Sequence, residues 1–154
     1  HRTCNNIVVV CRPPSGCLQS FNDSYNSLLN KLCTGNDKFE TYIAGDFNIN
    51  LLNYETHNDT NTFLNTAFEH HLYPIITRPM RFSNTSTILI DNIFTNNPGN
   101  NYYAGLLLTD LSDHLPIFYV SDNNYYEKKN LLYIEIPVIF LTAVFRNLPQ
   151  YCKL

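Results

Sequence analysis

The amino-acid sequence predicts a layered α/β (α+β) sandwich, with catalytic residues on loops at one edge of its sheets. Between Ile7 and Phe68, short runs of β-branched residues alternate with segments that have the apolar spacing of a helix. Between Ile75 and Val120, strand-like runs dominate. The length of 154 residues and the hydrophobic content of 44% are sufficient for one domain with its own core.

Each expected element follows from its pattern of apolar residues. Continuous β-branched runs predict strands, whereas apolar residues at steps of three and four predict a helix with one face on a sheet. Segments rich in Asn, Pro and Gly separate these runs, as expected for turns. The expected elements are a buried strand over Ile7–Cys11, a helix over Leu18–Leu32, a strand over Thr41–Ala44, a helix capped by Asp59 that runs past Phe68, and strands at Ile75–Ile76, Ile88–Phe94, Tyr103–Leu108 and Leu115–Val120.

The organisation weakens after Val120, so we expect one domain over 1–122 and a divergent C-terminal tail over 123–154. The stretch from Leu131 to Phe145 is apolar, but Glu135 and Pro137 interrupt it. A membrane-spanning helix needs roughly 20 apolar residues, so no membrane partner is expected. This stretch is expected to be a strand, a packed segment or a poorly structured end.

Charge and cysteine content limit the classes of function. A formal net charge of -3 gives no overall attraction to a phosphate backbone, so any nucleic-acid binding must use a local patch. The five cysteines form no C-x-x-C pair, and an odd number leaves one unpaired in any full disulfide framework. This pattern favours a reduced intracellular compartment.

The first candidate motif is Gly45-Asp46-Phe47-Asn48, which follows a predicted strand. An Asp and an Asn two residues apart can aim a carboxylate and an amide at one point. The carboxylate can hold a cation or orient a water, and the amide can donate to a phosphate oxygen. Taken alone, the motif is explained as well by the preference of Gly, Asp and Asn for tight turns.

The second candidate motif is Ser112-Asp113-His114, which precedes a predicted strand. It offers a metal ligand and an imidazole that can be protonated to meet a phosphoryl oxyanion. The alternative is a structural histidine. Adjacent Ser, Asp and His cannot easily form a relay in which the His bridges the other two, so a serine hydrolase is disfavoured.

Asp91 is an acid within the apolar run Ile90–Phe94. Burying a carboxylate costs several kcal/mol unless it is paired. We therefore expect Asp91 to contact His114 and to orient its imidazole, and the alternative is an Asp at an exposed strand edge.

Several short motifs, each weak alone, follow one another in a characteristic order. They are Val10–Gly16, Ile43–Asn50, Ile76–Pro79, Ser86–Phe94 and Leu111–Pro116. In this order they resemble the endonuclease domain of LINE-type (non-LTR) retrotransposons, a branch of the endonuclease/exonuclease/phosphatase superfamily. The resemblance covers about Ile7 to Val120, and it implies the C-terminal part of a four-layer α/β sandwich.

The resemblance implies a Mg²⁺-dependent (or Mn²⁺-dependent) DNA-nicking endonuclease and gives each motif residue a catalytic role. Asp46 is expected to orient or deprotonate the attacking water. Asn48 is expected to contact the scissile phosphate and to hold the metal with Asp46 and Asp113. His114 is expected to steady the pentacovalent phosphate, and Asp91 to orient that imidazole.

Further expectations concern substrate contacts and partners. Arg12 and Ser112 are expected to bind substrate. The implied partners are DNA and a reverse transcriptase domain in the parent polyprotein, with a monomeric chain that is nuclear when active. The alternatives are a non-catalytic remnant of the domain or a phosphomonoesterase of the same fold, and the Arg12–Gly16 loop favours the retrotransposon branch over the latter.

The chain departs from the pattern of this family in two places. Cys11 stands where the family usually has a Tyr that contacts the phosphate, and a thiol is a weaker donor. The Asn and the metal-binding Glu of the family's first strands have no match in this sequence. We therefore expect a chain truncated at its N-terminus that shows little or no Mg²⁺-dependent nicking of DNA by itself.

Overall fold

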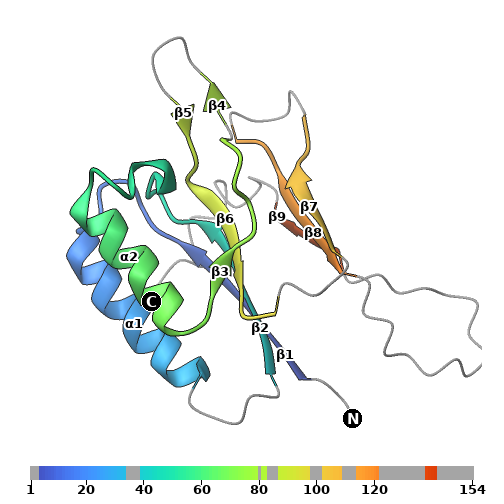
Figure 1. Cartoon of the computed structure of the whole chain (residues 1–154), viewed down its shortest axis with the longest axis horizontal. Helices are drawn as coiled ribbons and strands as arrows, with labels where there is room; N and C mark the ends of the chain where they lie inside the picture. Colours follow the sequence, from blue (N-terminus) through green and yellow to red (C-terminus); the bar gives the residue numbers. More distant parts are fainter. Residues whose placement is uncertain are drawn as a thin grey trace, which may run out of the picture.

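The described part of the chain contains two α-helices, one short 3-10 helix, two facing sheets and a two-stranded hairpin (Figure 1). The structure is a computed structural model, which describes residues 4–33, 39–79, 81–82, 87–97, 102–108, 114–121 and 138–141. The helices are α1 (Leu18–Cys33), the short 3-10 helix η1 (Leu51–Asn53) and α2 (Asn58–Glu69). The strands are β1 (Cys4–Cys11), β2 (Phe39–Asp46), β3 (Tyr73–Pro74), β4 (Arg81–Phe82), β5 (Thr87–Ile88), β6 (Asp91–Thr95), β7 (Tyr102–Leu106), β8 (Ile117–Ser121) and β9 (Val138–Leu141).

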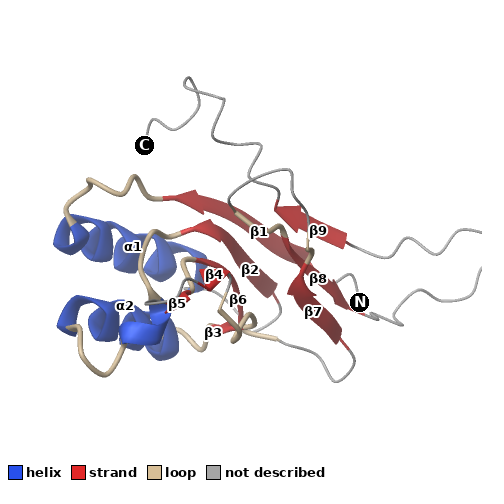
Figure 2. Cartoon of the chain, turned by 90° about the horizontal axis from the view of Figure 1, so that it is seen from above, coloured by secondary structure: helices blue, strands red, loops and turns tan. Residues whose placement is uncertain are grey.

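The central sheet has the strand order β1-β2-β6-β3. β1 and β2 run parallel, whereas β6 is antiparallel to both β2 and β3. Helices α1 and α2 cover one face of this sheet, and the antiparallel β7-β8-β9 sheet lies against the other face (Figures 1 and 2). These layers confirm the predicted α+β class.

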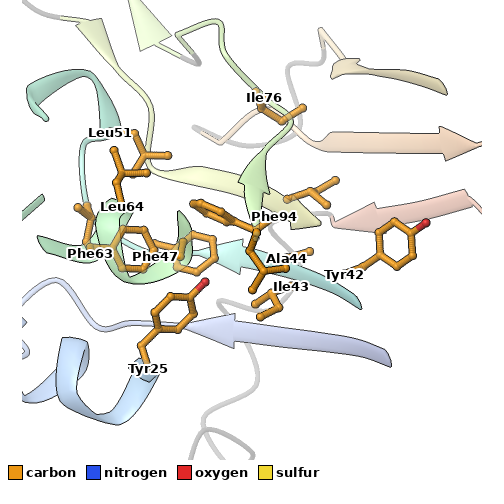
Figure 3. Packing of buried hydrophobic residues seen from close by; sticks show 14 of the residues in the cluster. Tyr25, Tyr42, Ile43, Ala44, Phe47, Leu51, Phe63, Leu64, Ile76 and Phe94 are labelled. Carbon is orange, nitrogen blue, oxygen red and sulfur yellow. The ribbon is translucent and has the colours of Figure 1, made fainter. Parts of the chain in front are cut away.

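The two faces of the central sheet bury different aromatic clusters. On the helix side, the ring of Phe47 lies 5.3 Å from that of Phe63 in α2 and 5.2 Å from that of Phe94 in β6 (Figure 3). On the opposite side, Tyr42 of β2 contacts Tyr119 of β8, with ring centroids 5.4 Å apart. The core therefore packs the middle of β2 against the second sheet, and the residue that follows β2 against the helices.

Strand β1 differs from the fully buried strand that its continuous apolar run predicts. Val8 and Val10 pack against the core, but Ile7 and Val9 are 60% and 55% exposed. The reason is its position at the end of the central sheet, where only one side of the strand meets a covering layer. A continuous apolar run does not distinguish a strand buried on both faces from one buried on a single face.

Two other predicted strands differ from the observed ones. The strand expected at Ile75–Ile76 is wrong, because β3 covers Tyr73–Pro74, and the backbone N–H and carbonyl of Ile76 bond to the buried side chain of Asn92 at 3.1 and 2.8 Å. The expected strand over Ile88–Phe94 is divided into β5 and β6, because the backbone N–H of Leu89 donates to Asn50 Oδ1 at 2.9 Å. The amide side chains of Asn92, which is buried, and of Asn50, which is partly buried, here replace the partners that a neighbouring strand would supply.

The cap of α2 differs from the prediction, and the predicted tail contains a strand. The cap of α2 is His57, whose side chain accepts from the backbone N–H of Thr60, so the expectation of Asp59 as the cap is wrong. Strand β9 lies within the predicted tail and pairs with β8, which makes part of the 131–145 stretch a strand. None of the described helices is long and apolar enough to cross a membrane.

We predict that Gly45→Ala lowers the free energy of unfolding by at least about 3 kcal/mol. Gly45 has a φ of 158°, and a Cβ added there would overlap the carbonyl oxygen of its register partner Val10. The measurement is urea unfolding. The matched control is Gly105→Ala, whose Cβ would come no nearer than 3.3 Å to the ring of Phe118, with an expected loss below about 1 kcal/mol. Equal losses for the two substitutions would contradict the steric argument.

Candidate active site

Three of the predicted catalytic residues lie at one end of the two facing sheets. Asp46 is the last residue of β2, Asp91 is the first residue of β6, and His114 precedes β8. Each offers one potential ligand atom, and these atoms all lie within 4.8 Å of one another. The antiparallel register of β2 and β6 explains this closeness, because it places Asp46 directly opposite Asp91.

A short hydrogen bond joins the two sheets at this end. His114 Nδ1 lies 2.7 Å from Asp91 Oδ2, and the side chains are only 5% and 13% exposed. The carboxylate accepts the Nδ1 proton, so Nε2 is the acceptor nitrogen of the neutral ring or the second donor of the protonated ring. The contact expected between Asp91 and His114 is thereby confirmed, while their catalytic roles remain predictions.

The facing carboxylates of Asp46 and Asp91 concentrate negative charge at this end of the sheet. Like charges directly opposite each other on neighbouring strands repel, and partial burial strengthens the repulsion. A protonated imidazole or a divalent cation relieves it. The carboxylate oxygens suit a hard cation such as Mg²⁺, and the imidazole nitrogen also suits Mn²⁺.

The loop after β2 holds Asn48 beside Asp46. The backbone N–H of Asn48 donates to Asp46 Oδ1 at 3.0 Å, and Asn48 adopts a left-handed conformation with φ of 48°. Asn tolerates this conformation better than other residues with a side chain. The Gly45–Asn48 motif is therefore a tight turn that also places two candidate site residues next to each other.

Arg12, expected to bind substrate, is turned into the protein. It is 7% exposed and donates through Nε to the carbonyl of Phe47, through Nη1 to that of Gly16 and through Nη2 to that of Asn48. The distances are 2.9, 2.7 and 2.8 Å. These contacts join two loops of the chain to each other, and the expected substrate contact of Arg12 stays a prediction.

Asn50 supports the site, although sequence reasoning assigned it no role. Its Oδ1 accepts from the backbone N–H of Leu89, and its Nδ2 donates to the carbonyl of Thr87 at 3.2 Å. These bonds tie the loop that follows Asp46 to the segment that precedes Asp91. Its place in the same motif as Asp46 was the available signal.

Two predicted site residues, Ser112 and Asp113, lie outside the described residues. Cys11 is described and exposed, at the end of β1 and in register with Asp46. Cys11 stands where the resemblance places a phosphate-contacting Tyr. This position therefore lies next to the candidate site in space.

A family model described as endonuclease-reverse transcriptase matches residues 5–118, which is most of the chain. The chain belongs to this family. The match confirms the resemblance to the endonuclease/exonuclease/phosphatase domain of LINE-type elements, and it identifies the described fold as a nuclease-type domain. Among curated proteins and solved structures, no significant match was found. All three clustered residues, Asp46, Asp91 and His114, lie within the matched region.

We predict that Asp91→Asn changes the tautomer of His114 in this endonuclease family member. With the carboxylate present, the neutral ring should carry its proton on Nδ1, whereas the amide variant should populate both tautomers. Long-range ¹H–¹⁵N correlation spectra of the ring report this directly. We also expect the free energy of unfolding to fall by about 1–3 kcal/mol, because a mostly buried charged hydrogen bond is lost.

The control for this substitution is Asp23→Asn, on the exposed surface of α1. It should leave the His114 spectrum and the free energy of unfolding unchanged. Identical ring spectra for the wild type and Asp91→Asn would show that the hydrogen bond does not set the tautomer.

Proposed function

We propose that this chain is the phosphodiester-hydrolysing part of a DNA-nicking endonuclease that uses Mg²⁺ or Mn²⁺. One observation carries the proposal: Asp46 and the hydrogen-bonded pair Asp91–His114 converge at the same end of two sheets. The membership of the endonuclease-reverse transcriptase family supports it. An acid, an imidazole and a second acid that orients the imidazole can together activate water and stabilise a phosphoryl group.

The residues present fit a divalent cation. Asp46 and Asp91 offer hard oxygen ligands on the same face of the sheet, within 4.8 Å of each other. Asn48 and Asp113 remain predicted ligands from the sequence. A bound cation would supply positive charge that stabilises the negative charge developing on the phosphate.

The side chains divide the chemistry between them. The Asp46 carboxylate orients the attacking water and accepts its proton, because it is the group least committed to other partners among the three. His114 donates a hydrogen bond from Nε2 to a phosphoryl oxygen when its ring is protonated, and Asp91 holds the ring in that orientation. Asn48 is held beside Asp46, and its amide nitrogen donates one hydrogen to the carbonyl of Arg12, which leaves the second hydrogen to donate to the scissile phosphate.

We further propose the biological setting of this reaction. The nicked DNA would provide a 3′-hydroxyl that primes a reverse transcriptase domain of the same polyprotein, within the nucleus. The description of the family, which joins an endonuclease to a reverse transcriptase, supports this setting. The net charge of -3 indicates that a monomeric chain contacts DNA through a local surface around the site.

Plasmid nicking tests the proposed reaction. Because no residue matches the metal-binding Glu that the resemblance implies, we expect weak nicking of supercoiled plasmid by the chain itself. Fusion behind the N-terminal segment of an intact relative should increase it. In that fusion, Asp46→Asn and His114→Ala should each lower the nicking rate by about 100-fold or more. Asp23→Asn should not change it.

The controls separate the rival functions. EDTA should abolish nicking, and Mn²⁺ electron paramagnetic resonance should show binding that Asp46→Asn weakens. Metal binding without nicking by a folded fusion would indicate a non-catalytic remnant. Faster hydrolysis of p-nitrophenyl phosphate than of plasmid would indicate a phosphomonoesterase.

A further inference from the structure

Arg12 is a buried cation whose charge is met by backbone carbonyls. Only 7% of the residue is exposed, and no carboxylate pairs with it in the described part of the chain. Charged side chains are seldom buried without compensation. The compensation here consists of three carbonyl oxygens and the ring of Phe21, whose centroid lies 6.0 Å from the guanidinium carbon.

The three carbonyls belong to the two loops that border the candidate site. Gly16 lies in the proline-rich loop between β1 and α1, where its backbone N–H also closes a turn on the carbonyl of Pro13. Phe47 and Asn48 lie in the loop after β2. The planar guanidinium thus spans the gap between the loops with one donor to the first and two to the second.

The backbone of Arg12 also bonds to the loop after β2. Its N–H donates to the carbonyl of Asp46 at 2.9 Å, and its carbonyl accepts from Asn48 Nδ2 at 2.6 Å. Asn48 is consequently held through both its own carbonyl and its side-chain amide. This double contact maintains the left-handed conformation of Asn48, which in turn brings its N–H to Asp46 Oδ1.

We propose that Arg12 is a positioning residue for hydrolysis, which orders Asp46 and Asn48 through the backbone of their loop and does not bind the substrate itself. The proposal rests on the proposed function of that site. Lysine cannot replace it, because a single ammonium group does not present the fixed planar fork that reaches three separate carbonyls. A displacement of about 1 Å in a catalytic group is sufficient to lower turnover by about 100-fold.

The test compares Arg12→Lys with Arg78→Lys in the full chain, because Arg78 is exposed and undergoes the same chemical change. In Arg12→Lys, the side-chain amide resonances of Asn48 should shift, and kcat for nicking in Mn²⁺ should fall by about 100-fold with KM within about twofold. Arg78→Lys should change neither the Asn48 resonances nor kcat.

The rival role, a direct phosphate contact by Arg12, gives a different result. Replacing a phosphate-binding arginine by alanine raises KM and lowers the salt dependence of DNA binding by about one unit of slope. An Arg12→Ala chain with this reduced slope, and with unchanged Asn48 resonances, would overturn the proposal. An unchanged slope with shifted Asn48 resonances supports it, even if the chain proves unable to nick DNA.

A measurement on the unmodified chain covers the case in which the variants fail to fold. The Nε–H proton of Arg12 should exchange slowly with solvent, because it is buried and bonded to Phe47. Its resonance should stay in place when a short DNA duplex is added with Ca²⁺. Fast exchange, or a shift that saturates with DNA, would contradict the positioning role.

Discussion

The hydrogen bond between Asp91 and His114 is the contact on which the geometry of the site depends. Asp91 belongs to the central sheet and His114 to the segment before β8. This 2.7 Å bond therefore sets the spacing of the two facing sheets at the end that holds the candidate site. At the opposite end of the interface, aromatic packing such as Tyr42 against Tyr119 does the same. The facing sheets are thus held at both ends, by a polar contact at one and an apolar contact at the other.

Three amide side chains and one guanidinium hold the loops around the candidate site in place. Asn48, Asn50 and Asn92 each bond to backbone groups of a different segment, and Arg12 bonds to two loops at once. The high Asn content of the sequence looks like compositional bias when read along the chain. In the fold, these particular amides take the place of strand partners where the β-strands end and the loops of the candidate site begin.

The sequence was sufficient for the elements whose pattern is local. The helix over Leu18–Cys33 follows from the apolar spacing within one segment. The pairing of Asp91 with His114, which lies 23 residues away, was predicted from the cost of burying an unpaired acid. The inward orientation of Arg12 and the exposure of Ile7 could not be read in the same way. The orientation of Arg12 depends on which loop covers its side chain, and the exposure of Ile7 depends on which strand forms the edge of the sheet. Neither can be read from a short stretch of sequence.

Asp46 and Asp91 lie directly opposite each other on neighbouring strands, and the repulsion between their carboxylates lowers the stability of the fold at the candidate site. Two partly buried carboxylates at paired positions of β2 and β6 destabilise the pairing of these strands whenever no positive charge lies between them. Natural selection for a sturdier fold would therefore favour an amide at either position, while selection for hydrolysis would preserve both acids. Retention of both carboxylates in a lineage is a sign that catalysis has outweighed robustness there.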